Sequence, residues 1–220
     1  MSNFSPISAD LFLSAVDSSG SLISLLRQRF QTGIVASAIH EPRLNDLPEQ
    51  TFTQAAVLVP IVLRSTGATL LLTQRTAHLR DHAGQISFPG GRCEPTDASP
   101  EATALREAQE EVSLAANQVE ILGQLPYYHT VTGFRIAPIV GLVTPPLNLK
   151  LDDFEVADVF EAPLSFLLDS GNHQRHQRAY QGKMREYWAM PWQERYIWGA
   201  TAGMIISLHD FLYLPSAKKP

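Results

Sequence analysis

The segment from residue 99 to residue 112 constrains the fold most strongly, because it has the marks of an amphipathic helix with a defined start. Ser99 is a residue type that caps helix N-termini, and Pro100 suits the first helical position. Apolar residues then recur at helical spacing and predict a core-facing stripe, formed by Ala104, Leu105, Ala108 and Val112. Strand-like runs lie on both sides of this helix in the chain, which favours an α/β fold with a mixed central sheet.

The strand-like runs are short, apolar and bounded by turn-forming residues. The runs 55–64 and 69–75 are separated by a Ser-Thr-Gly-Ala turn and predict a β-hairpin. Residues 76–91 read as a loop that ends in Phe-Pro-Gly-Gly. Later strands are expected near 118–127, 134–143 and 155–162, followed by a hairpin and a further strand within 177–198.

The two ends of the chain have helical character. Apolar spacing over residues 8–31 predicts two helices, which a Ser- and Gly-rich cluster at 18–21 separates. Residues 41–53 are polar and contain proline, as expected of a connector, and 200–212 predicts a terminal helix. The expected organisation is one domain over 1–220, with a helical extension and connector over 1–50 and the core over 51–220.

Composition narrows the class of protein. With 45% hydrophobic and 18% charged residues, the chain of 220 residues can bury a sizeable core. Its net charge of −5 disfavours broad nucleic-acid binding, which usually needs a basic surface, so a small molecule is the expected partner. Cys93 is the single cysteine and cannot form an intrachain disulfide. Without a signal-peptide pattern or a membrane-length apolar run, we expect a cytoplasmic protein without a membrane partner.

Three carboxylates share one face of the predicted helix. At about 100° per residue, Glu107 and Glu111 lie roughly 40° apart, and Glu110 lies roughly 60° to the other side of Glu107. Like charges three and four residues apart destabilise a helix, so a compensating group is expected. A divalent cation, which prefers hard oxygen ligands, would compensate them. Arg106 offers partial compensation by pairing with Glu110.

Taken alone, the helix is better explained by a plain acidic surface with one salt bridge. The preceding loop favours the cation, because Gly90 and Gly91 allow a backbone carbonyl to approach a ligand closely. A few carboxylates, a carbonyl and water suit Mg²⁺ bound to a diphosphate. Such an ion would offset phosphate charge and activate an attacking water.

The segment GRCEPTDASPEATALREAQEEVSL resembles the signature box of the Nudix hydrolase family. The matching positions are Gly91, Arg106, Glu107, Ala108, Glu110, Glu111 and Leu114. The chain departs from the box in two places. The spacer before Arg106 is one residue longer, which leaves the role of Asp97 open, and Ser113 stands where the box has glycine.

A second signature points to one branch of that family. LLTQRTAHLRDHAGQISFPGG, residues 71–91, is similar to the segment that marks the bacterial-type coenzyme A pyrophosphatases. Three later stretches, at 131–141, 155–164 and 196–205, also resemble this branch. The resemblance implies an α/β/α sandwich with a mixed sheet that hydrolyses the diphosphate bond of coenzyme A or its thioesters, giving 3′,5′-ADP and 4′-phosphopantetheine.

The resemblance also implies roles for the box residues. Glu107 and Glu111 would be the principal ligands of Mg²⁺ or Mn²⁺, together with the Gly91 carbonyl, and Gly90 would shape the loop. Glu110 would be a further ligand or would hold a bridging water. Arg106 would orient a box glutamate. The general base is open between box carboxylates, Glu107 foremost, and Glu155.

The 75–85 segment supplies the substrate-binding candidates, which are Arg75, Arg80, His82 and Gln85. Guanidinium groups suit phosphates because their donors are planar and permanently charged. The other histidines share no spacing typical of a transition-metal site. Trp188, Trp192 and Trp198 are expected to pack in the core or at an interface.

Two alternatives to coenzyme A hydrolysis remain at this point. One keeps the chemistry and changes the substrate to ADP-ribose, a dinucleoside polyphosphate or a damaged nucleotide. The other is a non-catalytic nucleotide sensor on the same scaffold, since a fold does not by itself imply catalysis. The complete carboxylate set argues against the sensor. A homodimer is left open.

Overall fold

A mixed β-sheet is the central layer of the computed structural model, which describes residues 19–32, 52–79, 82–180 and 182–213. The sheet has eight strands in the order β3-β2-β1-β7-β5, with β8 also paired to β2, β4 to β1 and β6 to β7. β1 and β7 run parallel and the other pairs are antiparallel. The strands are β1 Thr53–Arg64, β2 Gly67–Arg75, β3 Ile86–Ser87, β4 Gly90–Arg92, β5 Val119–Gln124, β6 Tyr128–His129, β7 Phe134–Val143 and β8 Val156–Pro163.

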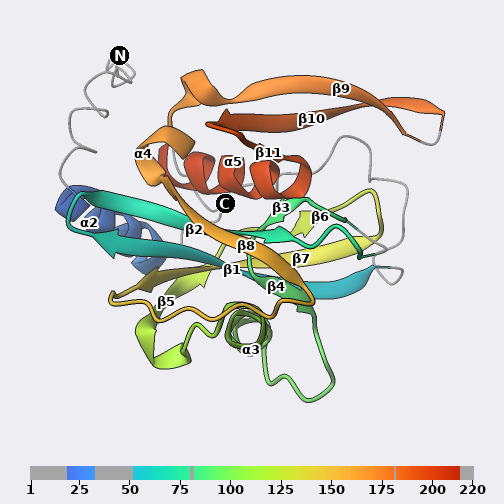
Figure 1. Cartoon of the computed structure of the whole chain (residues 1–220). Coiled ribbons are helices and arrows are strands. Elements are labelled where there is room, and N and C mark those ends of the chain that lie inside the picture. The colour runs from blue at the N-terminus through green and yellow to red at the C-terminus, as the bar shows by residue number, and fades with distance from the viewer. Residues whose placement is uncertain (1–18, 33–51, 80–81, 181, 214–220) are drawn as a thin grey trace, which may run out of the picture.

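Helices cover both faces of this sheet. Helix α3 (Pro100–Val112) lies on one face and α5 (Gly199–Tyr213) lies on the other, as Figure 1 shows. The predicted α/β/α sandwich with a mixed sheet is therefore confirmed. Helix α2 (Ser19–Gln31) packs at one end, where the Phe30 and Phe211 rings are 4.5 Å apart. None of the helices in the described ranges is long and apolar enough to cross a membrane.

A second, three-stranded sheet covers the outer side of α5 (Figure 1). It consists of β9 (Gln174–Tyr180), β10 (Lys183–Trp192) and β11 (Arg195–Trp198). Trp188 and Trp192 pack against the core around α5, and the Trp198 ring lies 5.3 Å from that of Tyr187. Trp188 and Trp192 therefore have the core packing expected of them, whereas Trp198 contacts aromatic rings of the second sheet.

Alternation along the strands divides the core in two. In β1, Leu58 and Val62 point toward α3, whereas Val59 and Ile61 point toward α5, because successive strand residues face opposite sides. Burial on both faces explains why β1 reads as a continuous apolar run rather than an alternating one. The predicted hairpin over 55–64 and 69–75 is confirmed, with Arg64 paired to Gly67 across the turn.

Several expectations need correction. Residues 76–91 contain two short strands, β3 and β4, because the main sheet pairs them with β2 and β1. Leu105 is only partly buried, and Thr103 takes its place in the core-facing stripe. Helix α2 begins at Ser19, inside the cluster expected to separate two helices. The first of the two helices predicted within 8–31 lies outside the described residues, as does almost all of the connector.

Candidate active site

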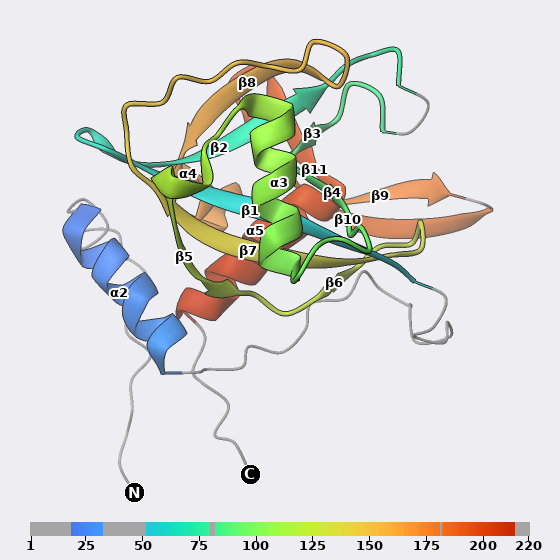
Figure 2. The ribbon, with the colours of Figure 1, turned by 90° about the horizontal axis from the view of Figure 1, so that it is seen from below.

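Helix α3 is held at both ends. At its start, the Ser99 Oγ accepts a hydrogen bond from the Ala102 N–H (3.3 Å), as the sequence predicts. At its end, Ser113 adopts a left-handed conformation (φ 56°, ψ 31°). The segment before β8 then crosses the C-terminal end of α3, where the Asp152 N–H donates to the Glu111 carbonyl (2.9 Å; Figure 2). The carboxylate face of the helix is thereby fixed against the sheet.

The glycine-rich bend lies directly against two of the carboxylates. A Cβ added at Gly91 would lie 2.4 Å from Glu107 Oε1, so only glycine lets this carboxylate approach the backbone of β4. The Gly90 N–H donates to Glu111 Oε2 at 3.3 Å. A Cβ at Gly90 would lie 2.5 Å from the Ala56 carbonyl oxygen of β1. The two glycines thus bring β4 close to both the sheet and α3.

Glu111 is the most deeply buried acid of the site. Its side chain is 5% exposed, and its Oε1 lies 3.8 Å from Arg75 Nη1. Burial raises the pKa of Glu111 to about 8; the charges of Glu107 and Glu155 add to the rise, while Arg75 and the Gly90 N–H oppose it. A buried carboxylate with so few donors would gain from a cation.

Glu107 is partly buried beside Glu111. Burial raises its pKa, the nearby charges of Glu110 and Glu155 raise it further, and its 3.0 Å contact with Arg106 lowers it. Glu155 thus repels both Glu107 and Glu111, which places its charge at the same centre. Its position is fixed through the backbone, since the Thr76 N–H donates to the Glu155 carbonyl (3.0 Å).

Arg106 connects the acidic face to the loop before α3. Its Nε and Nη2 atoms donate to the two Asp97 carboxylate oxygens at 3.0 and 2.9 Å, and its Nη1 donates to Glu107 and Glu110 at 3.0 Å each. Thr103 Oγ1 also donates to Asp97 (2.8 Å). Asp97, whose role the sequence leaves open, therefore anchors Arg106. The Arg106 guanidinium in turn holds the pKa of the Asp97 carboxyl well below its usual range.

The structure does not bring every predicted residue together. Glu110 points toward Arg106 and has a side chain that is 59% exposed, so it stands apart from the buried pair. Within the described part of the chain, no three His, Cys, Asp or Glu side chains are gathered as a metal site. A divalent ion would thus need the Gly91 carbonyl or water beside Glu107 and Glu111. Hard oxygen donors of this kind suit Mg²⁺ and Mn²⁺.

The substrate-binding candidates are spread along the segment between β2 and β3. Arg75 faces Glu111, and its Nε is buried without a hydrogen-bond partner among the described residues. His82 Nδ1 and Gln85 Oε1 lie 2.9 Å apart, so these two contact each other at the turn. Arg80 lies outside the described residues. Of these four residues, the structure places Arg75 beside the buried carboxylates.

Sequence reasoning missed the residues that hold the segment before β8. Thr76 and Asp152 fix the backbone around Glu155, because Asp152 O also accepts the Glu155 N–H (3.0 Å). Short polar residues near a turn are a weak signal for such a role. The partners to which Thr76 donates are 78 and 79 positions away. Asp152 bonds Glu111 across 41 positions, and its other partners belong to a turn whose conformation the sequence does not show.

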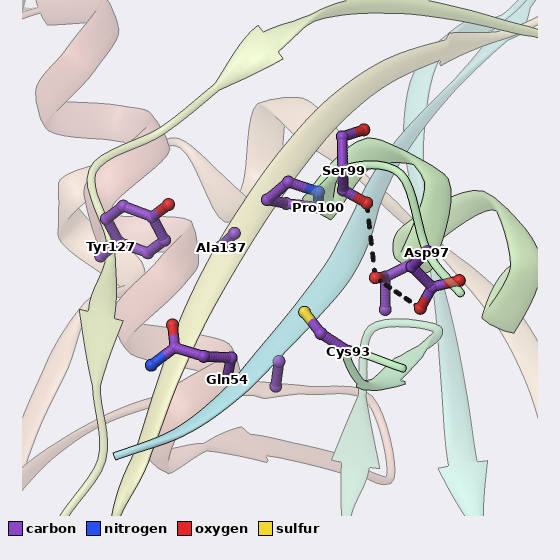
Figure 3. A pocket seen from close by; sticks show the side chains of 9 residues that line it. Gln54, Cys93, Asp97, Ser99, Pro100, Tyr127 and Ala137 are labelled. Atoms are coloured by element: carbon purple, nitrogen blue, oxygen red, sulfur yellow. Dashed lines mark hydrogen bonds between the residues drawn. The ribbon is translucent and has the colours of Figure 1, made fainter. Parts of the chain in front are cut away.

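A cavity of about 240 Å³ opens at the other end of α3, beside its first turn (Figure 3). Its lining residues are Gln54, Ala55, Cys93, Asp97, Ser99, Pro100, Thr103, Tyr127 and Ala137. Both Asp97 oxygens are already bonded to Arg106, as described above. Glu107 and Glu111 do not line this cavity, so it is separate from the acidic centre.

The chain resembles known proteins over most of its length. The family model described as the NUDIX domain matches residues 52–188. A relative from Citrobacter koseri, called uncharacterized Nudix hydrolase NudL, is 48% identical over 156 residues, which are 70% of this chain and 80% of the relative. A protein of the same name from Escherichia coli K12 is 45% identical over 155 residues, with the same coverage.

The fold is also similar to solved structures. The Nudix hydrolase RenU from M. Smegmatis aligns with a TM-score of 0.51 and 17% identity, covering 76% of this chain and 90% of RenU. At this identity the likeness concerns the fold alone. It agrees with the sandwich of helices around a mixed sheet seen here.

Proposed function

The chain belongs to the Nudix hydrolase family, and from this premise we propose that it hydrolyses the diphosphate bond of coenzyme A or its thioesters. The products would be 3′,5′-ADP and 4′-phosphopantetheine or its acylated form. At the coarser level, the family makes the protein a hydrolase of pyrophosphate bonds in nucleoside diphosphate derivatives.

One observation carries the choice of coenzyme A. The 71–91 segment, which resembles that of coenzyme A pyrophosphatases, leads through Arg75 and Gly90 directly into the acidic centre. The Arg75 guanidinium can still bind a ligand, since its contact with Glu111 is 3.8 Å long and its side chain is 25% exposed. A guanidinium in this state suits the oxygens of a diphosphate.

Nudix hydrolases use divalent metal ions, and we assign Mg²⁺ or Mn²⁺ to Glu107, Glu111 and the Gly91 carbonyl. The fit rests on Glu111, which is 5% exposed and has no strong donor, and on Gly91, which leaves room for the Glu107 carboxylate. When bound, the ion would supply charge compensation for the phosphate oxygens and make water a better nucleophile. Glu110, whose side chain is exposed, would hold a water molecule rather than bind the metal ion directly.

Each remaining residue then has a separate task. Glu155 is proposed as the general base, because no described residue donates a hydrogen bond to its carboxylate while its charge reaches both Glu107 and Glu111. Arg106 holds Glu107 in place and is held by Asp97. Arg75 would bind phosphate oxygens. Positioning and charge stabilisation would dominate, since phosphate is a good leaving group.

The test is direct. Purified protein is incubated with coenzyme A and Mg²⁺ or Mn²⁺, and the products are identified by mass. We expect 3′,5′-ADP and 4′-phosphopantetheine. Glu111→Gln should fold and lose turnover by orders of magnitude, whereas Glu101→Gln, on the same helix, should be fully active. Normal turnover by the Glu111 variant would refute the assignment of the site.

ADP-ribose is the alternative substrate that the same chemistry admits. A panel of ADP-ribose, dinucleoside polyphosphates and coenzyme A, compared by kcat/KM, separates the two proposals. A higher kcat/KM for ADP-ribose would overturn the choice of coenzyme A and leave the assigned site unchanged.

A further inference from the structure

An exposed aromatic ring lies beside the acidic centre. The Phe154 side chain is 66% exposed, the largest exposure among the big apolar residues that the structure describes. Phe154 directly precedes Glu155, and the Phe154 carbonyl is bonded to Thr76, the neighbour of the Arg75 that faces Glu111. A single exposed apolar residue is common on protein surfaces, but a ring next to a charged site is available to contact a ligand bound there.

The backbone under this ring is firmly held. The Phe154 N–H donates to Asp152 Oδ1 (2.9 Å), and the Phe154 carbonyl accepts from Thr76 Oγ1 (2.8 Å). The Thr76 N–H donates to the next carbonyl, that of Glu155, at 3.0 Å. The backbone that carries the ring is therefore fixed, so only the side chain has to be ordered when a ligand binds.

A second ring supports the first. The His78 ring centroid lies 4.9 Å from that of Phe154 at an interplanar angle of 57°. His78 comes from the segment after β2, two residues beyond Thr76 and three beyond Arg75, which faces Glu111. The aromatic pair Phe154–His78 thus joins the two segments that carry Arg75 and Glu155.

We propose that Phe154, backed by His78, stacks on the nucleobase of the substrate while the diphosphate lies at Glu107, Glu111 and Arg75. The proposal rests on the function proposed above and makes Phe154 a specificity-determining residue. In a nucleotide one ribose separates the base from the diphosphate, so a ring carried next to Glu155 lies on a segment that a bound base could contact. Stacking on a flat base would cover the exposed ring and is favourable for any base.

The pair AMP and ribose 5-phosphate tests this directly, since the two differ only in the base and neither has a diphosphate bond to cleave. Binding of each is measured by calorimetry in Mg²⁺. We expect wild-type protein to prefer AMP, and Phe154→Ala to weaken AMP binding roughly tenfold. Binding of ribose 5-phosphate should not change. With coenzyme A, the same variant should show a similar rise in KM and a nearly unchanged kcat.

Two further variants separate stacking from simple apolar contact. Phe154→Trp should keep the preference for AMP, because it keeps a flat ring, whereas Phe154→Leu should lose it. Met184→Ala is the matched control, since Met184 is 65% exposed on β10 in the second sheet. Its removal should leave both affinities unchanged.

Three results would overturn the proposal: wild-type protein that binds AMP no better than ribose 5-phosphate, unchanged AMP binding in Phe154→Ala, or full AMP affinity in Phe154→Leu. These outcomes differ from failure of the proposed function. Absence of coenzyme A products, with the expected AMP pattern intact, would refute coenzyme A as substrate and retain the stacking role of Phe154.

Discussion

At the scale of single residues, Gly91 shows how closely the site is built. The Glu107 carboxylate occupies the space where any other residue would place its Cβ, 2.4 Å from Oε1. The conformation at Gly91 is one that alanine accepts, because its φ is not in the left-handed region. The requirement for glycine is therefore steric, and the nearest obstacle is the Glu107 carboxylate.

Gly91→Ala should reduce kcat roughly a hundredfold, because a displacement of Glu107 by about 1 Å is enough for such a loss. The fold should survive, since Glu107 is 16% exposed and can turn outward. The measurement is turnover at saturating metal of the substrate that the product assay identifies. Gly20→Ala in α2, where a Cβ meets nothing within 4 Å, is the control. Equal kcat in both variants would contradict the packing described.

Asp97 acts on the site through Arg106. Replacing it with Asn removes the charge that holds the guanidinium, so Glu107 loses part of its support. Asp97→Asn should therefore raise the Mg²⁺ concentration for half-maximal activity by roughly 10- to 100-fold. The measurement is a metal titration of activity.

Asp97→Glu, which keeps the charge, should recover most of the metal affinity. Glu94→Gln in the same loop should behave as wild type, because the Glu94 side chain is exposed and does not contact Arg106. A merely structural role for Asp97 would lower stability in Asp97→Asn and leave the metal titration unchanged.

At the scale of elements, the exit of α3 is strained. Ser113 has φ 56°, a left-handed conformation that glycine adopts at no steric cost and serine does not. The signature box has glycine at this position, a residue that would adopt this conformation without strain. The exit matters to the site because it sets where the segment before β8 passes over Glu111.

Ser113→Gly should raise the free energy of unfolding by about 0.5 to 1 kcal/mol, measured by urea denaturation. Ser113→Ala keeps the strain and should be neutral or slightly destabilising. Activity should change in neither variant, since no hydrogen bond joins the Ser113 hydroxyl to a described site residue. A larger gain from Ala than from Gly would show that the strain is absent.

At the scale of the whole molecule, the buried carboxylates link stability to pH. Glu107 and Glu111 have raised pKa values in the folded protein, so the folded state holds protons that the unfolded state has released. Their contribution to stability is present below the unfolded pKa, near 4.3, and is lost as pH rises toward about 8 for Glu111. Asp97 acts in the opposite direction at acid pH, because its pKa is lowered.

In Glu111→Gln, the free energy of unfolding should therefore fall less as pH rises. In metal-free buffer, we expect the variant to be the more stable protein at pH 8 and to lose the advantage by pH 5. Each pKa unit corresponds to about 1.4 kcal/mol, so the difference is measurable by urea denaturation at the two pH values. Added Mg²⁺ should stabilise wild type more than the variant at pH 8. Identical pH dependence in the two proteins would contradict the burial of Glu111.

The sequence by itself determined the elements whose signals are local. The cap at Ser99, the carboxylate face of α3 and the hairpin of β1 and β2 follow from spacing and residue type, because each depends on neighbours a few positions away. The family follows in the same way, since its box is one contiguous segment. The sandwich with a mixed sheet then followed from the order of elements and from the family.

Only the tertiary structure decided which side chains meet. Glu111 is buried and Glu110 exposed, although both lie on one helical face, because the sheet and β4 cover one side of it. Asp97 anchors Arg106, and Thr76 holds the Phe154–Glu155 backbone from 78 positions away. Burial and long-range hydrogen bonds depend on packing between elements, and no local pattern of residues specifies them.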